Sequence, residues 1–225
     1  IIVLSKSAAD YFKETYDRET KIIPNGIDRP IRRKANKITE TFGLHKDEYI
    51  CVISRLTAEK GIHYLIDAYN RIKTDKKLVI AGDTSDTDDY VAHIKEMAAG
   101  NKNIIFTGFV SGEMLDELYS NAYAMCLPSD IEGLSLRRWE ALAYKNALIC
   151  SDIPENTAVA EDKAIYFKKG NVDDLLAKLK KICDNEQRRN DLRKDADEFI
   201  LKKYSCTASA KATYELYEKI MGGMT

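Results

Sequence analysis

Several features are missing from this sequence of 225 residues, and each absence excludes a class of protein. No apolar run approaches the roughly eighteen residues that a transmembrane helix needs. The formal net charge is -1, so no excess of positive charge favours nucleic acid or an anionic membrane surface as a partner. The motifs G-x-S-x-G, G-x-G-x-x-G and G-x-x-x-x-G-K-[ST] are absent, which weakens the case for a hydrolase, a dehydrogenase or a P-loop enzyme.

Cysteine pairs and metal-binding spacings are also missing. The five cysteines form no C-x-x-C pair and no Cys/His zinc pattern; they are Cys51, Cys126, Cys150, Cys183 and Cys206. We expect free, buried thiols in a reducing cytoplasm. Two Asp-x-Asp pairs, 86–88 and 195–197, resemble a metal-binding motif. Because this short pattern is common, we expect solvated acids there and no bound metal.

Apolar and amphipathic segments alternate along most of the chain. Runs rich in Val and Ile predict strands buried on both faces, as in a parallel sheet, over residues 49–54, 77–82, 103–108, 123–127, 147–151 and 164–167. Helices are predicted after Ser5 and over residues 39–43, 61–73, 89–99, 112–122, 173–184, 187–204 and 208–221. This order predicts an α/β fold with a Rossmann-like, doubly wound parallel sheet.

The most informative stretch runs from Pro128 to Leu142 and reads as the end of a strand, a polar loop and a helix. Glu132 is expected in the loop at the carboxyl end of the strand, Ser135 at the helix N-cap, and Glu140 inside the helix. Ligands of open α/β sheets bind at the carboxyl ends of strands, and a helix N-terminus there attracts anions. Two carboxylates beside an anion site suit a ligand with phosphates and several hydroxyls, such as a nucleotide sugar.

A second stretch, residues 52–62, also follows a strand and opens a helix. Arg55 and Lys60 flank the turn, five positions apart. Positive groups of this kind bind a diphosphate and stabilise it as a leaving group. Taken alone, the stretch favours a solvated loop that carries ordinary surface charges.

The spacing of Glu132 and Glu140, within Glu-Gly-Leu and Glu-Ala-Leu, resembles the signature of the family 4 retaining glycosyltransferases, the glycosyl transferases group 1. The segment from Arg55 to Gly61 is similar to this family's Gly-Arg-Leu…Glu-Lys-Gly pattern, with Ser54 in place of the first Gly. The resemblance extends over residues 2–221. It implies a GT-B fold, in which two Rossmann-like domains face each other across a cleft.

The resemblance implies that residues 1–225 form the C-terminal, donor-binding domain. Residues 1–30 would be a crossover segment from a missing N-terminal acceptor domain, and residues 206–221 a C-terminal helix. The lack of an initiator Met fits an excised fragment, which we expect to be inactive alone. The intact protein is expected in the cytoplasm, with the missing domain able to place it at the inner face of the membrane.

The resemblance also implies a role for each site residue. Arg55 and Lys60 would hold the donor's phosphates, Glu132 would lie by the sugar, and Glu140 would bind the ribose hydroxyls. Loop and helix-start residues would complete the donor site through Gly133, Leu134, Ser135 and Leu136, with the amides of the last two on the distal phosphate. Main-chain groups of Gly108, Phe109 and Val110 would hold the nucleobase. The chain departs from the family's usual residues at Ser135, Arg137 and Trp139.

The implied reaction is transfer of a hexosyl group, with retention, from a UDP-, GDP- or ADP-linked sugar to an acceptor hydroxyl on a glycan or lipid-linked glycan. Glycan, polysaccharide or glycolipid synthesis is the expected setting, without cofactor or metal. No protein nucleophile is implied, and the leaving diphosphate could itself take the acceptor's proton. Two alternatives stay open: another enzyme on the same scaffold, such as a nucleotide-sugar epimerase or a phosphorylase, and a non-catalytic nucleotide-binding module.

Overall fold

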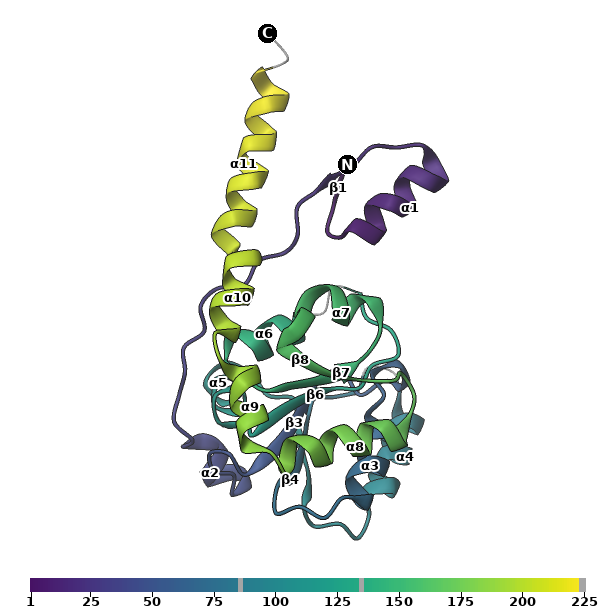
Figure 1. Ribbon diagram of the computed structural model, residues 1–225, viewed down its shortest axis with the longest axis vertical. Coiled ribbons are helices and arrows are strands. Elements are labelled where there is room, and N and C mark those ends of the chain that lie inside the picture. The colour runs from purple at the N-terminus through teal and green to yellow at the C-terminus, as the bar shows by residue number, and fades with distance from the viewer. Residues whose placement is uncertain (85–86, 134–135, 223–225) are drawn as a thin grey trace. The chain divides into compact units, whose positions relative to one another are not determined.

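The computed structural model describes residues 1–84, 87–133 and 136–222 (Figure 1). Its strands are β1 (Ile2–Val3), β2 (Lys21–Ile22), β3 (Tyr49–Ile53), β4 (Lys77–Ala81), β5 (Ile104–Gly108), β6 (Ala124–Leu127), β7 (Leu148–Ser151) and β8 (Ala164–Phe167). Its α-helices are α1 (Lys6–Tyr16), α2 (Lys37–Phe42), α3 (Ile62–Arg71), α4 (Asp88–Ala98), α5 (Gly112–Asn121), α6 (Arg137–Ala143), α7 (Pro154–Ala160), α8 (Val172–Cys183), α9 (Glu186–Arg193), α10 (Ala196–Lys203) and α11 (Cys206–Gly222). Two 3-10 turns, η1 (Ala58–Lys60) and η2 (Glu161–Lys163), complete the described elements.

The chain divides into two compact units. One comprises Ile1–Arg29 with Glu198–Thr225, and the other comprises Pro30–Asp197. The larger unit holds a six-stranded parallel sheet in the order β5-β4-β3-β6-β7-β8. All six strands predicted from the sequence are confirmed. The predicted burial on both faces is wrong for β5, which lies at the edge of the sheet and is only partly buried.

The order of the strands decides which face each helix covers. The chain steps from β3 to β5 in one direction and then from β6 to β8 in the other. Right-handed crossovers therefore place α3 and α4 on one face and α5, α6 and α7 on the opposite face (Figure 1). Helix α8 packs against α3 and closes the first face. The reversal between β3 and β6 is the topological switch point of the sheet.

The larger core is built from alternate residues of the strands. Ile50 and Val52 of β3 join a buried cluster with Leu65 and Ile66 of α3 and Leu179 of α8. The helix predicted over residues 61–73 thus packs its apolar side chains into the core. Phe106 packs against this cluster, whereas Phe109 is exposed, so only the first of these two phenylalanines contributes to the core.

One predicted helix is wrong, and one helix was missed. Residues 187–204 form two helices, α9 and α10, because Asp195 adopts a left-handed backbone with φ of 56°. The break brings Asp197 inward, where it is buried and pairs with Arg32 at 3.0 Å and Lys145 at 3.2 Å, contrary to the expected solvated acid. Helix α7 was not predicted at all. Asp86 lies outside the described residues.

The smaller unit holds a parallel pair of two-residue strands, β1 and β2, with α1 between them. Ser5 caps α1 as predicted, because its side chain accepts a hydrogen bond from the Ala8 amide at 3.2 Å. A short bridge pairs Ile27 with Ser205. Helix α11 forms where expected, but none of its described residues is buried.

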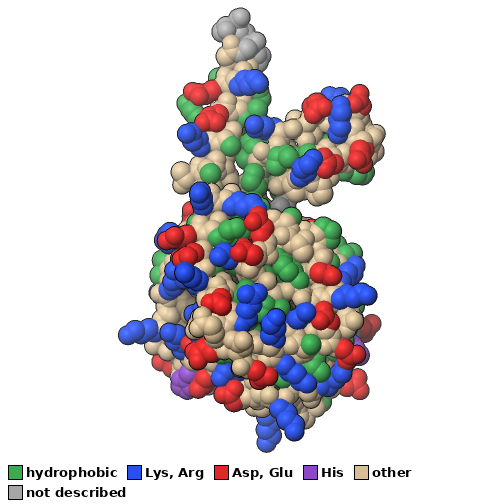
Figure 2. All heavy atoms as spheres, in the orientation of Figure 1, with side chains coloured by type: hydrophobic (Ala, Val, Ile, Leu, Met, Phe, Trp, Pro, Cys, Tyr) green, Lys and Arg blue, Asp and Glu red, His purple; other side chains and the backbone are tan. Residues whose placement is uncertain are grey.

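The distribution of surface charge and the state of the cysteines can be compared with what the sequence predicts. Basic and acidic side chains are intermixed over the face shown in Figure 2, as a net charge of -1 implies. All five cysteines are free, and Cys51, Cys126 and Cys150 are buried in strands. Cys183 and Cys206 are only partly buried, contrary to the expectation for all five thiols. None of the described helices combines the length and the hydrophobicity needed to cross a membrane.

Candidate functional site

A cavity of about 510 Å³ lies at the switch point, between the loops that follow β3 and β6. It is lined by the last residues of both strands, by the two loops and by the start of α6. These residues are Ile53, Ser54, Arg55, Lys60, Leu127, Glu132, Gly133, Leu136, Arg137 and Glu140. The volume is within the usual range for small-molecule sites, roughly 300–1,000 Å³. The structure therefore brings the two glutamates and the two predicted cations into one cavity.

Lys60 and Glu132 form a buried ion pair across this cavity. The Lys60 Nζ lies 2.9 Å from the Glu132 Oε2, and the two side chains are only 12% and 4% exposed. The Ser129 hydroxyl donates to the other carboxylate oxygen at 2.6 Å. Apart from the Lys60 ammonium, no described group donates a hydrogen bond to Oε2, so this oxygen can accept a further hydrogen bond from a ligand hydroxyl.

Gly61 explains how Lys60 reaches Glu132. Its backbone is left-handed, with φ of 65°, and a β-carbon there would lie 2.1 Å from the Pro128 carbonyl oxygen. Only glycine allows the turn after Lys60 to pass so close to the second loop. A hydrogen bond from the Asp130 amide to the Glu59 carbonyl, at 2.8 Å, also joins the two loops.

Arg55 is held much more loosely than Lys60. Its side chain is 66% exposed, and its guanidinium lies 3.8 Å from the Glu59 carboxylate. That carboxylate also accepts a hydrogen bond from the Thr57 hydroxyl at 2.6 Å, and this hydrogen bond is the main reason that the pKa of Glu59 is lowered. An exposed pair at this distance contributes little to stability, so Arg55 is free to turn toward a ligand.

Glu140 lies in the first turn of α6 and is not simply solvated. Its Oε2 accepts hydrogen bonds from the Tyr119 hydroxyl at 2.7 Å and from Arg137 at 2.8 Å. Burial, together with the charge of Glu140, raises the pKa of Tyr119 well above its usual value. Tyr119 therefore stays protonated and donates to the carboxylate. Sequence reasoning missed both partners; Arg137 was noted only as a departure from the family pattern.

A buried polar network holds the loop that carries Glu132. Asn156 of α7 donates to the Ser151 carbonyl at 3.0 Å, and the Ser151 hydroxyl donates to the Ser129 carbonyl. Arg138 donates to the Gly133 carbonyl at 3.3 Å. Sequence reasoning missed this network, because the seven-residue helix α7 was not predicted.

Three of the predicted donor residues do not line the cavity. Gly108, Phe109 and Val110 lie at the carboxyl end of β5, which is separated from β3 by β4. Phe109 is exposed and Val110 is buried. Leu134 and Ser135 lie outside the described residues, so the predicted cap at Ser135 is not described; α6 begins at Arg137. Among the described residues, no cluster of three His, Cys, Asp or Glu side chains could hold a metal ion.

Comparisons with known proteins agree on the kind of protein. A family model described as "Glycosyl transferases group 1" matches residues 34–199. An uncharacterized glycosyltransferase of Methanocaldococcus jannaschii is 28% identical, over 98% of this chain and 60% of that protein. The alpha-D-kanosaminyltransferase of Streptomyces kanamyceticus is 24% identical, over 82% of this chain and 49% of that protein.

A solved structure shows the same fold. The crystal structure of Anabaena HepE in complex with UDP and glucose has a TM-score of 0.87 at 18% identity, over 97% of this chain and 62% of that chain. HepE has also been crystallised with UDP-glucose. The chain spans 49–60% of the length of the first curated relatives that it matches.

Proposed function

The chain belongs to the glycosyl transferases group 1 family and has the fold of one half of a GT-B glycosyltransferase, and on that premise we propose that its central cavity binds a nucleoside diphosphate sugar. The observation that carries the proposal is the composition of one cavity. Three cations, Arg55, Lys60 and Arg137, surround it together with two carboxylates, Glu132 and Glu140. Cations suit phosphates, and carboxylates suit hydroxyls.

Each residue has a role in this proposal. Arg55 and Lys60 bind the diphosphate, and Lys60 leaves or shares its contact with Glu132 to do so. Glu132 accepts a hydrogen bond from a sugar hydroxyl at Oε2, the oxygen that faces Lys60. Glu140 accepts hydrogen bonds from the ribose hydroxyls, in competition with Arg137.

The backbone contributes at two further places. The Leu136 amide, close to the start of α6, binds the distal phosphate, where the helix dipole favours negative charge. Ser135 is proposed to do the same. The nucleobase extends toward Gly108–Val110 at the carboxyl end of β5, and the Gly133 backbone bounds the sugar.

We propose that the whole protein transfers a hexosyl group with retention to an acceptor hydroxyl, in the manner of family 4 enzymes. The acceptor, a glycan or a lipid-linked glycan, would bind to a second domain of the whole protein, outside residues 1–225. Arg55, Lys60 and the helix start would stabilise the leaving diphosphate. With these groups on the diphosphate, the proposal requires no metal.

A binding screen tests this function. UDP, GDP and ADP, each with and without a linked hexose, are titrated calorimetrically against the chain. One nucleoside diphosphate and its sugar should bind, while the corresponding free nucleoside binds much more weakly. Equal affinity for the nucleoside and the diphosphate would contradict the proposal, and so would binding that Arg55→Ala and Lys60→Ala leave unchanged.

A further inference from the structure

A second cavity, of about 360 Å³, has a wall that is mostly basic. Six of its nine lining residues are Lys or Arg: Arg32, Arg33, Lys34, Lys46, Lys145 and Arg193. Asn121 ends α5 just before β6, and Lys145 follows α6 just before β7. This basic cavity therefore lies at the amino edge of the parallel sheet, opposite to the edge where Glu132 and Glu140 lie.

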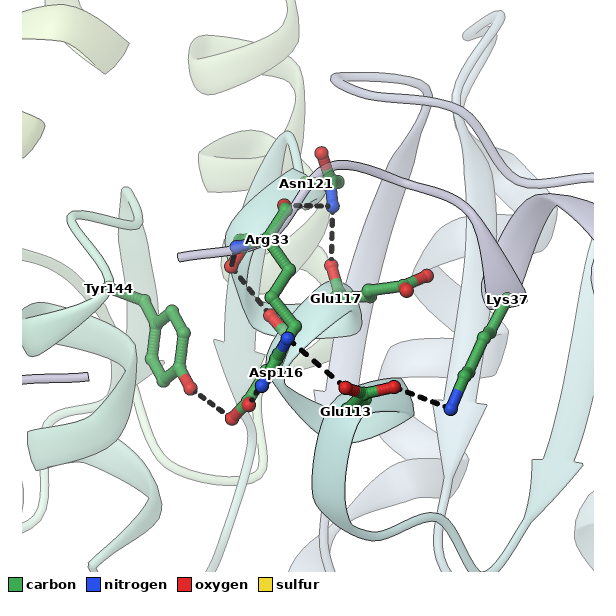
Figure 3. Close-up of polar contacts among 8 residues, drawn as sticks. Arg33, Lys37, Glu113, Asp116, Glu117, Asn121 and Tyr144 are labelled. Carbon is green, nitrogen blue, oxygen red and sulfur yellow. Dashed lines mark hydrogen bonds and ion pairs between the residues drawn. The ribbon is translucent and has the colours of Figure 1, made fainter. Parts of the chain in front are cut away.

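The segment that carries three of these cations is anchored without any ligand. Ser120 accepts a hydrogen bond from the Arg33 amide at 3.0 Å. Asn121 donates to the Arg33 carbonyl at 3.1 Å (Figure 3). The Arg33 guanidinium donates to Asp116 at 3.0 Å, and Tyr144 donates to the same carboxylate. Contacts within the protein therefore hold this part of the wall in place without a bound anion.

The positive charge of this wall is only partly compensated. No acidic side chain lines the cavity; the acids pair from behind, as Asp197 does with Arg32 and Lys145. Lys34 and Lys46 are exposed and form no ion pair or hydrogen bond with another described residue. Burial, the charge of Arg189 and the charge of Arg32 all lower the pKa of Arg193, against the opposing effect of Asp47.

Two of the basic residues in the wall have a structural role at the C-terminus of α6. Arg193 donates to the Lys145 carbonyl at 2.9 Å, and Arg32 lies 3.4 Å from the Ala143 carbonyl, where the negative end of the α6 dipole attracts cations. This explains two of the six positive residues. It does not explain Lys34 and Lys46, which contact neither a carbonyl nor a carboxylate among the described residues.

We propose that the basic cavity binds a small anion with phosphate groups, such as a diphosphate or a phosphorylated sugar, at a site separate from the candidate donor cavity. Guanidinium groups match phosphate oxygens in geometry, and the two lysines add charge. The cavity volume falls within the usual range for small ligands. Because the cations surround a hollow, we assign a freely diffusing phosphate compound and not a lipid headgroup. The site does not depend on the proposed glycosyltransferase function.

Inorganic pyrophosphate is the probe that tests this site, titrated into the full-length protein. The variant Lys34→Ser/Lys46→Ser should raise the Kd of a pyrophosphate site at least tenfold. The matched control Lys95→Ser/Lys102→Ser removes two exposed lysines that also have no described partner, and it should leave that Kd unchanged. The variant Arg55→Ala/Lys60→Ala distinguishes binding at the two cavities, because it should leave the Kd of pyrophosphate at the basic cavity unchanged.

Three results would overturn the proposal. The first is equal weakening by the two lysine variants, which would indicate a general charge effect. The second is the absence of any pyrophosphate binding that depends on Lys34 and Lys46. The third is a lipid-binding result: the protein floats with vesicles of phosphatidylglycerol but not of phosphatidylcholine, the flotation requires Lys34 and Lys46, and pyrophosphate does not bind. This result would assign the cavity to a lipid surface.

Discussion

The two edges of the parallel sheet hold cavities that differ in how their cations are paired. At the carboxyl edge every cation has a glutamate: Arg55 with Glu59, Lys60 with Glu132, and Arg137 with Glu140. At the amino edge Arg32, Arg33, Lys145 and Arg193 also pair with acids, but those acids lie behind the wall, and no acidic side chain lines the cavity. The paired cavity can distinguish a ligand that has both hydroxyls and phosphates, whereas the basic cavity can select only for negative charge. Binding at the amino edge should accordingly be more sensitive to salt.

The largest effect at the carboxyl edge of the sheet is expected from the variant Lys60→Met. It leaves Glu132, whose side chain is 4% exposed, without its counter-charge, and breaking a buried pair in this way costs about 3–5 kcal/mol. Urea unfolding should show this loss. The double variant Lys60→Met/Glu132→Leu should recover most of it, because no charge is then left buried. A single variant that costs less than about 1 kcal/mol would mean that solvent already screens the pair.

The variant Glu117→Ala tests the anchoring of the amino edge. The Glu117 carboxylate is buried and accepts hydrogen bonds from the Asn36 amide at 2.9 Å and the Ile38 amide at 3.0 Å, at the start of α2. Hydrogen bonds to a charged group contribute about 1.5–3 kcal/mol, so we expect a loss of about 3 kcal/mol in the free energy of unfolding. The control Glu113→Ala removes a half-exposed partner of Lys37 and should cost no more than about 1 kcal/mol. Equal costs would contradict this account of α2.

The variant Arg55→Ala should separate binding from stability. Arg55 is exposed and weakly paired, so the free energy of unfolding should change by less than about 0.5 kcal/mol. The affinity for the nucleoside diphosphate should fall by about 1.5–3 kcal/mol, measured by calorimetry with the free nucleoside as control. Loss of stability without loss of affinity would place Arg55 in the scaffold.

The sequence predicted the sheet well because its signals are local. Each strand is an apolar run, and each long helix has an amphipathic pattern that adjacent residues define. The break at Asp195 was missed because no Gly or Pro marks it. Helix α7 was missed because its seven residues are too few for a periodic pattern.

The sequence predicted some members of the candidate site, but not Arg137 and not the contacts between the members. The motifs named Lys60, Glu132 and Glu140, and the structure places all three at one cavity. They did not show that Lys60 pairs with Glu132. They also did not show that the Glu140 carboxylate accepts hydrogen bonds from Tyr119 and Arg137. Such contacts join loops and helices far apart in the chain, so only the three-dimensional arrangement reveals them.

The pairing changes one expectation about Glu132. From the sequence alone, the variant Glu132→Gln should leave binding of the nucleoside diphosphate nearly untouched. In the structure, Glu132 pairs with Lys60, so under the proposed function it would compete with the diphosphate for this cation. Neutralising it should therefore leave this affinity unchanged or increase it, and should weaken only the ligand that carries a sugar.

The most direct test of the paired cavity as a donor site is calorimetric titration of UDP and UDP-glucose, or of the pair that the screen selects, into the wild type, Glu132→Gln and Glu140→Gln. The exposed Glu96→Gln serves as control. Glu140→Gln should weaken both ligands by the same factor, about tenfold, which corresponds to one lost hydrogen bond of about 1.4 kcal/mol. Glu132→Gln should weaken only the sugar-linked ligand. Wild-type affinity of Glu140→Gln for both ligands, or equal weakening of both by Glu132→Gln, would contradict the account.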